Sequence, residues 1–305
     1  MIKWIFTKIR AFINSPILKK QLESEEKNLL AMGALLSMQQ TLMDSRNIND
    51  YEFKIFSQWG DDGIIQYLIK NVKIQNNTFI EFGVEDYQES NTRFLMFNNN
   101  WSGFVMDNSS DAINRLKSQD WYWKYCLDCK VAFIERNNIN QLLTDSGLSN
   151  IGLLSIDIDG NDYHILSEID MSRLNPSIII MEYNSVFGFE RAITIPYRDD
   201  FMRAKEHSSN LYFGASLSAL NYLANNIGYV LVGCNIAGNN AYFIRKDLIN
   251  DKVGEIPVKS AFKNSQFREG RKEDYSLSFI SGEKRVEAIK GLKVINVSTG
   301  QEEKL

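Results

Sequence analysis

The chain has 305 residues, of which 44% are hydrophobic and 24% are charged, and this composition excludes an intrinsically disordered protein. Lys and Arg number 34 against 38 Asp and Glu, and the resulting net charge of −4 excludes a general nucleic-acid binder. Three cysteines (Cys126, Cys129 and Cys234) are too few for a disulfide framework. An odd number of cysteines is typical of a reducing compartment, so we predict a cytoplasmic protein.

The first 20 residues contain several basic side chains and no acidic one. Lys8 and Arg10 interrupt the apolar residues, so the segment falls short of the ~20 apolar residues that a membrane span needs. Two interpretations stay open for residues 1–20. One is a basic amphipathic helix in peripheral contact with the inner face of a membrane. The other is a terminal helix docked on its own protein or on a partner.

Residues 21–45 form the next predicted helix. Leu22, Leu29, Leu36 and Met43 recur at every seventh position, which is the spacing of a helix that packs along one side. Such a helix could pair with a second copy and make a homo-oligomer, or it could pack on its own domain. We therefore treat residues 1–50 as an N-terminal helical extension.

From residue 51 to residue 250 the pattern alternates between helix and strand. Helical periodicity is present at residues 61–72, 91–98, 110–118, 139–146, 162–169 and 216–226. Short apolar runs, weakest at 131–134, occur at residues 78–82, 103–106, 131–134, 153–158, 177–181, 229–234 and 241–245. Continuous apolar strands alternating with helices predict an α/β fold, a Rossmann-like, doubly wound and mostly parallel sheet. Residues 251–305, with a short helix at 283–291, are predicted to be a C-terminal appendage packed on this domain.

Polar residues close the predicted strands, and ligands of parallel sheets bind at that edge. These residues are Glu81, Asp107, Asp157 with Asp159, and Glu182. The first loop has one glycine, Gly83, followed by acidic residues that repel phosphate, which argues against a dinucleotide cofactor. S-adenosylmethionine fits better because it is cationic at sulfur and at its amine, and an acid at Asp107 can accept both ribose hydroxyls.

The motif IEFG at 80–83 and Asp107 stand where the first two motifs of Rossmann-fold, S-adenosylmethionine-dependent methyltransferases stand. Five further motifs are FSQWGDDG at 56–63, ESNTRFL at 89–95, NWSG at 100–103, LSIDIDGND at 154–162 and MEYN at 181–184. These five resemble the FkbM-related methyltransferases of bacterial surface-polysaccharide biosynthesis. The resemblance extends from about Phe56 to the region of residues 281–283. It implies an S-adenosylmethionine-dependent O-methyltransferase that acts on a glycan or an activated sugar.

The resemblance also implies roles for particular residues. Glu81 and Gly83 would line the methionine end of the cofactor, Asp107 would hold the ribose, and Asn91 with Thr92 would begin the next helix beside it. Gln58 and Gly60 would close over the site, and Asp157 is assigned to the same cofactor pocket. The usual methyltransferase pattern has two or three glycines in the first loop, where this chain has only Gly83. A non-catalytic binding or scaffold protein with a helical arm is therefore the alternative.

A sugar hydroxyl must lose its proton before it attacks a methyl group, and two devices stay open. His207 could act as the general base. Alternatively, Asp159, Glu182 and Asn184 could hold Mg²⁺ or Mn²⁺ through hard oxygen ligands. For binding of the acceptor sugar the candidates are Tyr183, Arg191 and Tyr197, the last two in the long connection after the fifth strand.

Overall fold

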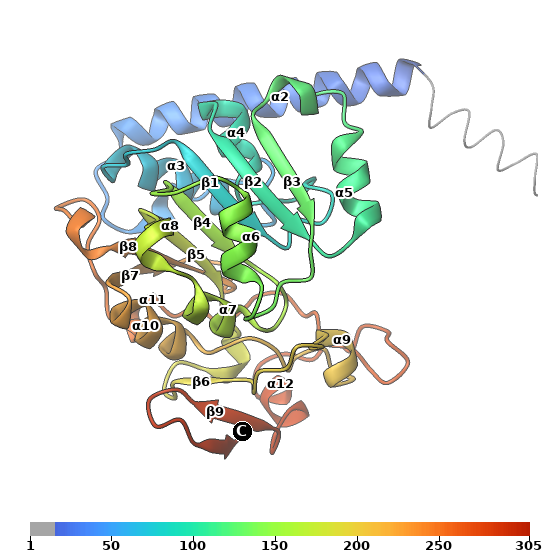
Figure 1. Ribbon diagram of the computed structural model, residues 1–305, viewed down its shortest axis with the longest axis vertical. Helices are drawn as coiled ribbons and strands as arrows, with labels where there is room; N and C mark the ends of the chain where they lie inside the picture. Colours follow the sequence, from blue (N-terminus) through green and yellow to red (C-terminus); the bar gives the residue numbers. More distant parts are fainter. Residues whose placement is uncertain (1–15) are drawn as a thin grey trace, which may run out of the picture.

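The computed structural model describes residues 16–305, so the membrane interpretation of the first 20 residues falls largely outside the described part. A seven-stranded sheet with the order β3-β2-β1-β4-β5-β8-β7 forms its centre (Figure 1). The strands are β1 (Thr78–Phe82), β2 (Ser102–Asp107), β3 (Leu127–Val131), β4 (Leu153–Ile156), β5 (Ile178–Glu182), β7 (Tyr229–Cys234) and β8 (Asn240–Arg245). Strands β1 to β5 are parallel, whereas β8 is antiparallel to both β5 and β7. The predicted Rossmann-like, mostly parallel sheet is confirmed.

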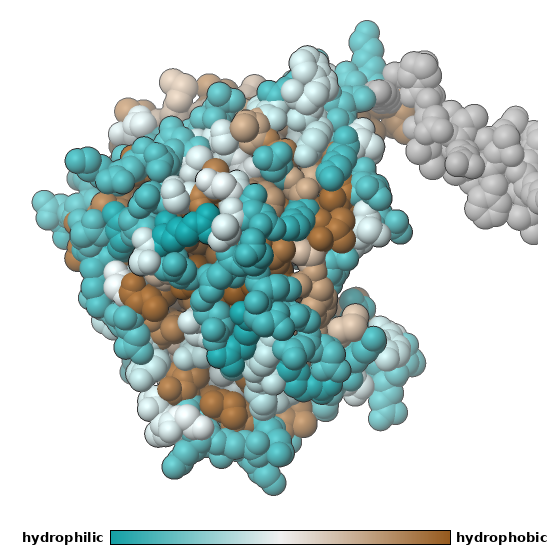
Figure 2. Space-filling model, viewed as in Figure 1, coloured by the Kyte–Doolittle hydropathy of each residue, from teal (hydrophilic) through white to brown (hydrophobic). Residues whose placement is uncertain are grey.

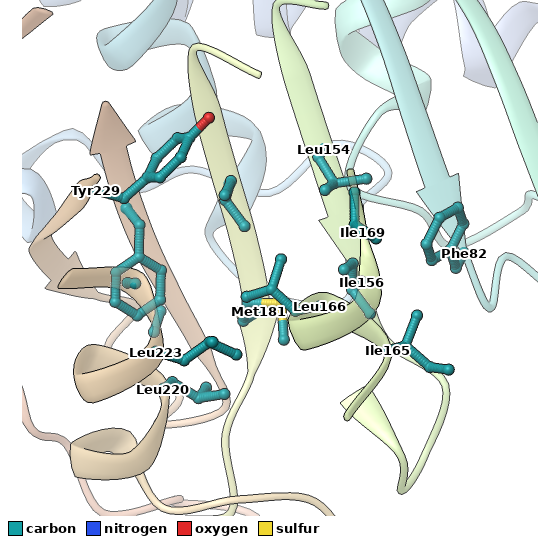
Figure 3. Close-up of a cluster of buried hydrophobic side chains, with 14 of the residues drawn as sticks. Phe82, Leu154, Ile156, Ile165, Leu166, Ile169, Met181, Leu220, Leu223 and Tyr229 are labelled. Atoms are coloured by element: carbon teal, nitrogen blue, oxygen red, sulfur yellow. The ribbon is translucent and has the colours of Figure 1, made fainter. Parts of the chain in front are cut away.

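Helices cover both faces of this sheet. They are α3 (Asp61–Asn71), α4 (Arg93–Asn99), α5 (Ser110–Lys117), α6 (Ile139–Asp145), α7 (Asp162–Glu168), α8 (Met171–Leu174) and α10 (Leu217–Asn226). Alternate residues of each buried strand point to opposite faces, so the core consists of two clusters. On one face β4 and β5 pack on α7 and α10, and Figure 3 shows Ile156 and Met181 beside Leu166 of α7. On the other face Phe79 and Ile180 pack on α3, α4 and α5.

The weakest predicted strand was misplaced. The apolar run at 131–134 predicted a strand there, but β3 occupies Leu127–Val131 and ends where that run begins. Strand β3 lies at the edge of the sheet, and most of its residues are at least partly exposed. An edge strand of this kind does not need a continuous apolar sequence, so apolar periodicity does not locate it.

The long helix α2 (Pro16–Gln39) lies across α3 and α4 (Figure 1). Gly33 faces the ring of Phe94, where a Cβ atom would lie 2.5 Å from a ring carbon, so glycine permits the close packing. Ser37 donates to Gln66 of α3 at 2.9 Å. The helix therefore docks on its own domain through these small and polar residues and through Leu30, which packs against the cluster of Ile55, Phe56 and Phe94. Large apolar residues such as Met32 and Leu35 stay exposed. Helix α2 lies along the top of the molecule in Figure 1, and brown and tan atoms appear along the same margin in Figure 2.

The C-terminal part of the chain builds a second, three-stranded sheet. It pairs β6 (Ile193–Thr194) with β9 (Lys293–Asn296), which in turn pairs with β10 (Glu302–Lys304). The short helices nearby are α9 (Arg203–Glu206), α11 (Val258–Ala261) and α12 (Glu283–Ala288). Short 3₁₀ turns occupy Gln40–Leu42, Ile48–Tyr51, Tyr122–Lys124, Ser185–Phe187 and Lys246–Leu248. Within residues 16–305 no helix has the length and apolarity required to cross a membrane.

Candidate active site

The carboxyl ends of the parallel strands open into one pocket of about 1090 Å³. Glu81 of β1, Asp107 of β2, Glu182 of β5 and Asp157 just beyond β4 all line it. In Figure 2 the molecular surface is indented on the side where α9 lies beyond the strand ends. The prediction that acidic residues gather at this edge of the sheet is thus in agreement with the structure.

Glu81 is buried and holds the loop that precedes α4. Its carboxylate accepts hydrogen bonds from the Ser90 hydroxyl at 2.6 Å and from the Asn91 and Thr92 backbone N–H groups at 2.9 and 3.1 Å. Burial raises the pKa of Glu81, and these hydrogen bonds oppose the rise. The carboxylate therefore fixes Asn91 at the pocket wall, where the Asn91 amide donates to Ser155 at 3.1 Å.

Asp107 ties the first two loops of the sheet together. One of its carboxylate oxygens accepts from the Glu85 backbone N–H at 2.8 Å, and the other accepts from Ser109 N–H at 2.8 Å. The side chain is 9% exposed and lines the pocket. Each carboxylate oxygen has a further lone pair available, so two neighbouring hydroxyls can still donate to Asp107.

Gly83 lies where the first loop touches the end of β4. Its φ angle is +75°, and a Cβ atom there would lie 1.6 Å from the backbone carbonyl oxygen of Asp157. Only glycine fits both the left-handed backbone and the contact. One glycine is therefore sufficient to bring this loop against β4.

Three carboxylates form an acidic cluster: Asp157, Asp159 and Glu182. One oxygen atom from each lies within 4.8 Å of the others. Burial raises the pKa of Asp157 and Glu182 well above the usual range for carboxyl groups, and the negative charges of neighbouring carboxylates raise it further. One oxygen of Glu182 is buried without a hydrogen-bond partner within residues 16–305. Carboxylates this close need a shared proton or a cation between them.

Arg203 of α9 is the counter-ion of this cluster, and sequence patterns did not indicate it. Its guanidinium pairs with Asp159 at 2.7 Å and with Glu269 at 2.5 Å, and it lies 3.5 Å from the centre of the Phe213 ring. Burial disfavours its charge, but Glu182, Glu269 and Asp159 together raise the pKa of Arg203. The guanidinium therefore stays charged and stays paired with Asp159 in the pocket lining.

Two residues predicted for proton removal or metal binding do not line the pocket. The buried Asn184 side chain donates to the carbonyl oxygens of Leu211 and Phe213 at 2.9 and 3.0 Å, so its amide N–H groups are bound to the backbone. In the acidic cluster Asp157 takes the position that the sequence suggested for Asn184. His207 follows α9, and its Nδ1 atom forms a hydrogen bond with the Ser209 hydroxyl at 2.8 Å.

The three residues predicted to bind the acceptor also lie outside the pocket lining. The Tyr183 hydroxyl donates to the carbonyl oxygen of Lys263 at 2.7 Å. Arg191 pairs with Glu303 of β10 at 2.5 Å. Tyr197 contacts Arg136, whose guanidinium lies 5.2 Å from the centre of the Tyr197 ring. These contacts hold the connection after β5 and the second sheet in place.

Of the remaining predicted residues, Gln58 lines the pocket, whereas Gly60 and Thr92 stand beside it as the residues preceding α3 and α4. The ring of Trp59 stacks on Phe267, with centroids 5.4 Å apart and planes inclined by 17°. Asn240 also lines the pocket, and its amide oxygen is buried without a hydrogen-bond partner in the described chain. Trp59 stands within the recognised FSQWGDDG motif, but nothing in the sequence points to Phe267.

Comparison with known proteins places this geometry in a known class. The family model for the methyltransferase FkbM domain matches residues 131–231, which extend from β3 to β7. The resemblance seen in the motifs is confirmed over these residues. The protein is a methyltransferase with a Rossmann-like core. A search of curated proteins gave no match.

Several solved structures match part of the chain at low sequence identity and with TM-scores below 0.5. An S-adenosylmethionine-dependent methyltransferase from Clostridium acetobutylicum ATCC 824 is 10% identical, with a TM-score of 0.35 over 61% of this chain and 90% of that chain. M. capricolum TrmK in complex with S-adenosylhomocysteine is 14% identical, with a TM-score of 0.36 over 66% of this chain and 76% of that chain. The N-terminal domain of EvdMO1 with S-adenosylhomocysteine bound is 9% identical, with a TM-score of 0.36 over 62% of this chain and 80% of that chain.

Proposed function

We propose that the protein transfers a methyl group from S-adenosylmethionine to a hydroxyl group of a sugar or glycan, with a divalent cation held at the acidic cluster. One observation carries the proposal. Asp107, the acid that can accept both ribose hydroxyls, lines the same pocket as the cluster of Asp157, Asp159 and Glu182. The pocket thus combines a place for a cationic nucleoside with a place for activating an oxygen nucleophile.

The residues present fit the cofactor. Asp107 is anchored by two backbone N–H groups and can accept the two ribose hydroxyls, and Gly83 keeps the neighbouring loop close without a side chain. The acidic lining suits a ligand with a positive sulfur and a positive amine. S-adenosylmethionine supplies an electrophilic methyl group, and the task of the chain is to align the acceptor oxygen with it.

Asp157, Asp159 and Glu182 would hold Mg²⁺ or Mn²⁺, because three hard oxygen atoms lie within reach of one ion. The charge of such an ion lowers the pKa of a hydroxyl bound to it, which favours loss of the proton. The unpartnered Glu182 oxygen supports this arrangement, since a buried carboxylate oxygen needs a partner. A base at His207 is not required, although that role stays a prediction.

The acceptor is proposed from the chemistry of the pocket wall. Asn108, Asn161, Asn239 and Asn240 line the same pocket as the acidic cluster. Amides and carboxylates together can bind many hydroxyl groups, which suits a sugar. The FkbM resemblance supports a place in surface-polysaccharide biosynthesis, and the size of the pocket admits a cofactor with a sugar beside it.

Titration calorimetry with S-adenosylhomocysteine tests the proposal. We expect Asp107→Ala to weaken binding at least about tenfold, since charge-assisted hydrogen bonds to the ribose are lost. Asp111→Ala, which removes an exposed acid from the first turn of α5, is the matched control and should bind as the wild type does. Equal affinity in the Asp107 and Asp111 variants would refute the cofactor site.

A second titration tests the cation. We expect wild-type protein to bind Mn²⁺ and Glu182→Gln to bind it at least about tenfold more weakly, with the affinity for S-adenosylhomocysteine retained. Mn²⁺ binding that survives in both Glu182→Gln and Asp157→Asn would remove the cation from the mechanism. The proton would then have to be taken by a residue of the chain.

A further inference from the structure

A second pocket, of about 480 Å³, adjoins the first. Phe267 and Arg268 line both pockets, so the two share a wall. Ser185 lines the second pocket and follows Glu182 of the acidic cluster by three residues. At roughly 3.3–3.6 Å per residue, at most about 11 Å of chain separates them.

Arg285 is the unusual residue of this second pocket. It is 5% exposed, its Nη1 donates to the Ser265 hydroxyl, and its Nε has no hydrogen-bond partner within residues 16–305. Within residues 16–305 Arg285 forms no ion pair with a carboxylate. The negative charge of Glu269 acts on Arg285, but that carboxylate is already paired with Arg203 at 2.5 Å. A buried guanidinium without a carboxylate is costly, so an anion in the pocket would stabilise it.

The other polar groups of the pocket suit an anion too. The Ser185 and Ser265 hydroxyls are hydrogen-bonded at 2.9 Å, and Ser265 also receives the Arg285 bond. Arg268 is exposed at the wall that the two pockets share. Glu283 is the opposing charge in the lining, but it is exposed and therefore screened by water. The lining thus contains two guanidinium groups and two hydroxyls that favour an anion, and one carboxylate that opposes it.

We propose that this second pocket binds a phosphate or diphosphate group carried by the acceptor sugar. The inference rests on the proposed function, because it places the sugar at the acidic cluster. The phosphate then lies in the second pocket, which Ser185 lines three residues after Glu182. The acidic cluster itself repels phosphate, so the two ends of such an acceptor sort into pockets of opposite charge. The acceptor class is then an activated sugar, linked through diphosphate to a nucleoside or to a lipid.

Calorimetric titration of the full chain with inorganic pyrophosphate tests the pocket. The buffer contains EDTA and neither phosphate nor sulfate, so that no cation at the acidic cluster attracts the probe. We expect Arg285→Gln and Arg268→Gln to raise the dissociation constant at least about tenfold, since charge-assisted bonds to the anion are lost. Lys284→Gln removes an exposed charge of the same sign next to Arg285 and should leave the affinity unchanged.

S-adenosylhomocysteine is titrated into the same preparations, which separates the two proposals. If wild-type protein binds S-adenosylhomocysteine but not pyrophosphate, the phosphate pocket is wrong and the proposed function stands. If it binds pyrophosphate and not S-adenosylhomocysteine, the proposed function fails. Pyrophosphate affinity unchanged in both arginine variants would also overturn the pocket. Should Arg285→Gln fail to fold, the exposed Arg268→Gln decides alone.

Two further probes distinguish the carrier. Uridine diphosphate and geranyl diphosphate are titrated into wild-type protein and Arg285→Gln. Tighter binding of the first assigns a nucleotide-linked sugar, and tighter binding of the second assigns a lipid-linked sugar. Equal affinities, both lost in Arg285→Gln, show that the pocket recognises the diphosphate itself.

Discussion

His164 shows how a single partly buried side chain makes the stability of this fold depend on pH. It lies on α7, and its Nε2 forms a hydrogen bond with the carbonyl oxygen of Ile195 at 2.8 Å. Burial lowers the pKa of His164, and the bond to Ile195 opposes part of that effect. The folded protein therefore favours the neutral imidazole, which joins α7 to the segment that follows β6.

The sign of the pH effect follows from that direction. When the pH falls below the ordinary histidine value of 6.5, the unfolded chain takes up the proton before the folded protein does. Stability is then lost by up to about 1.4 kcal/mol for each pH unit. Urea denaturation at about pH 7.5 and about pH 5.5 should show a larger loss for wild-type protein than for His164→Gln. Ser167→Ala, on the same helix, should keep the wild-type loss, and an equal loss in the His164 variant would contradict the assignment.

Single residues also mark what the sequence could and could not indicate about the site. The strand-end acids were predictable, because parallel strands place their carboxyl ends at one edge. Asn184 lies outside the pocket lining because asparagine favours the position before a helical turn, and its side chain accepts from Val186 N–H there. Arg203 contacts Asp159 and Glu269 only through tertiary folding, so no local sequence pattern predicted these ion pairs.

At the scale of elements, the loop after β1 depends on one close contact between backbones. Gly83 and Gly147 both have a positive φ angle, +75° and +70°. They differ in their surroundings, since a Cβ at Gly147 meets nothing within 4 Å. The pair therefore separates the strain of a left-handed backbone from the collision with β4.

We expect Gly147→Ala to cost about 1–2 kcal/mol, the strain of a left-handed alanine, and to leave the affinity for S-adenosylhomocysteine unchanged. Gly83→Ala adds an overlap with the Asp157 carbonyl and must push the loop away from β4. It should lose more stability than Gly147→Ala and bind S-adenosylhomocysteine at least about tenfold more weakly. Denaturant titration and calorimetry of both variants measure the two effects. Equal behaviour of the two alanine variants would show that the contact with β4 has no functional role.

The elements differ in how far the sequence specified them. Strands β1, β4 and β5 were predictable because they are buried on both faces and must be apolar throughout. Strand β3 was misplaced because its exposed edge position permits polar residues. The pocket wall at residues 267–269 could not be predicted for a different reason, since it belongs to an irregular segment with no periodicity.

At the scale of the whole molecule, distant parts of the chain close the pocket together. Trp59 comes from the segment before α3 and Phe267 from the segment after α11, and they stack at the pocket wall. Composition suggested that residues 251–305 are an appendage. In the structure they also supply Glu269, the partner of Arg203, and the residues of the second pocket. We therefore expect the site to depend on the C-terminal segment.

Helix α2 is the other feature of the whole molecule, because it stays apolar on the side that faces away from the domain. Met32 is 55% exposed and Leu35 is 67% exposed, and Leu42, in the 3₁₀ turn that follows α2, is 87% exposed. The helix docks through Gly33 and Ser37, so these large side chains have no role in holding it to its own domain. We therefore propose that they pack against a second copy of the chain, one of the two roles that the seven-residue spacing of Leu22, Leu29, Leu36 and Met43 left open.

Light scattering after size-exclusion chromatography tests this proposal. Wild-type protein should elute as a dimer or a larger oligomer, and the double variant Met32→Glu, Leu35→Glu should shift to the monomer mass, because burying carboxylates in an apolar interface is unfavourable. Asn28→Glu, which adds a charge at an exposed polar position of the same helix, should keep the wild-type mass. The affinity for S-adenosylhomocysteine should be equal in all three proteins, since α2 does not line the pocket. A monomeric wild-type protein would leave the apolar side of α2 without a role in self-association.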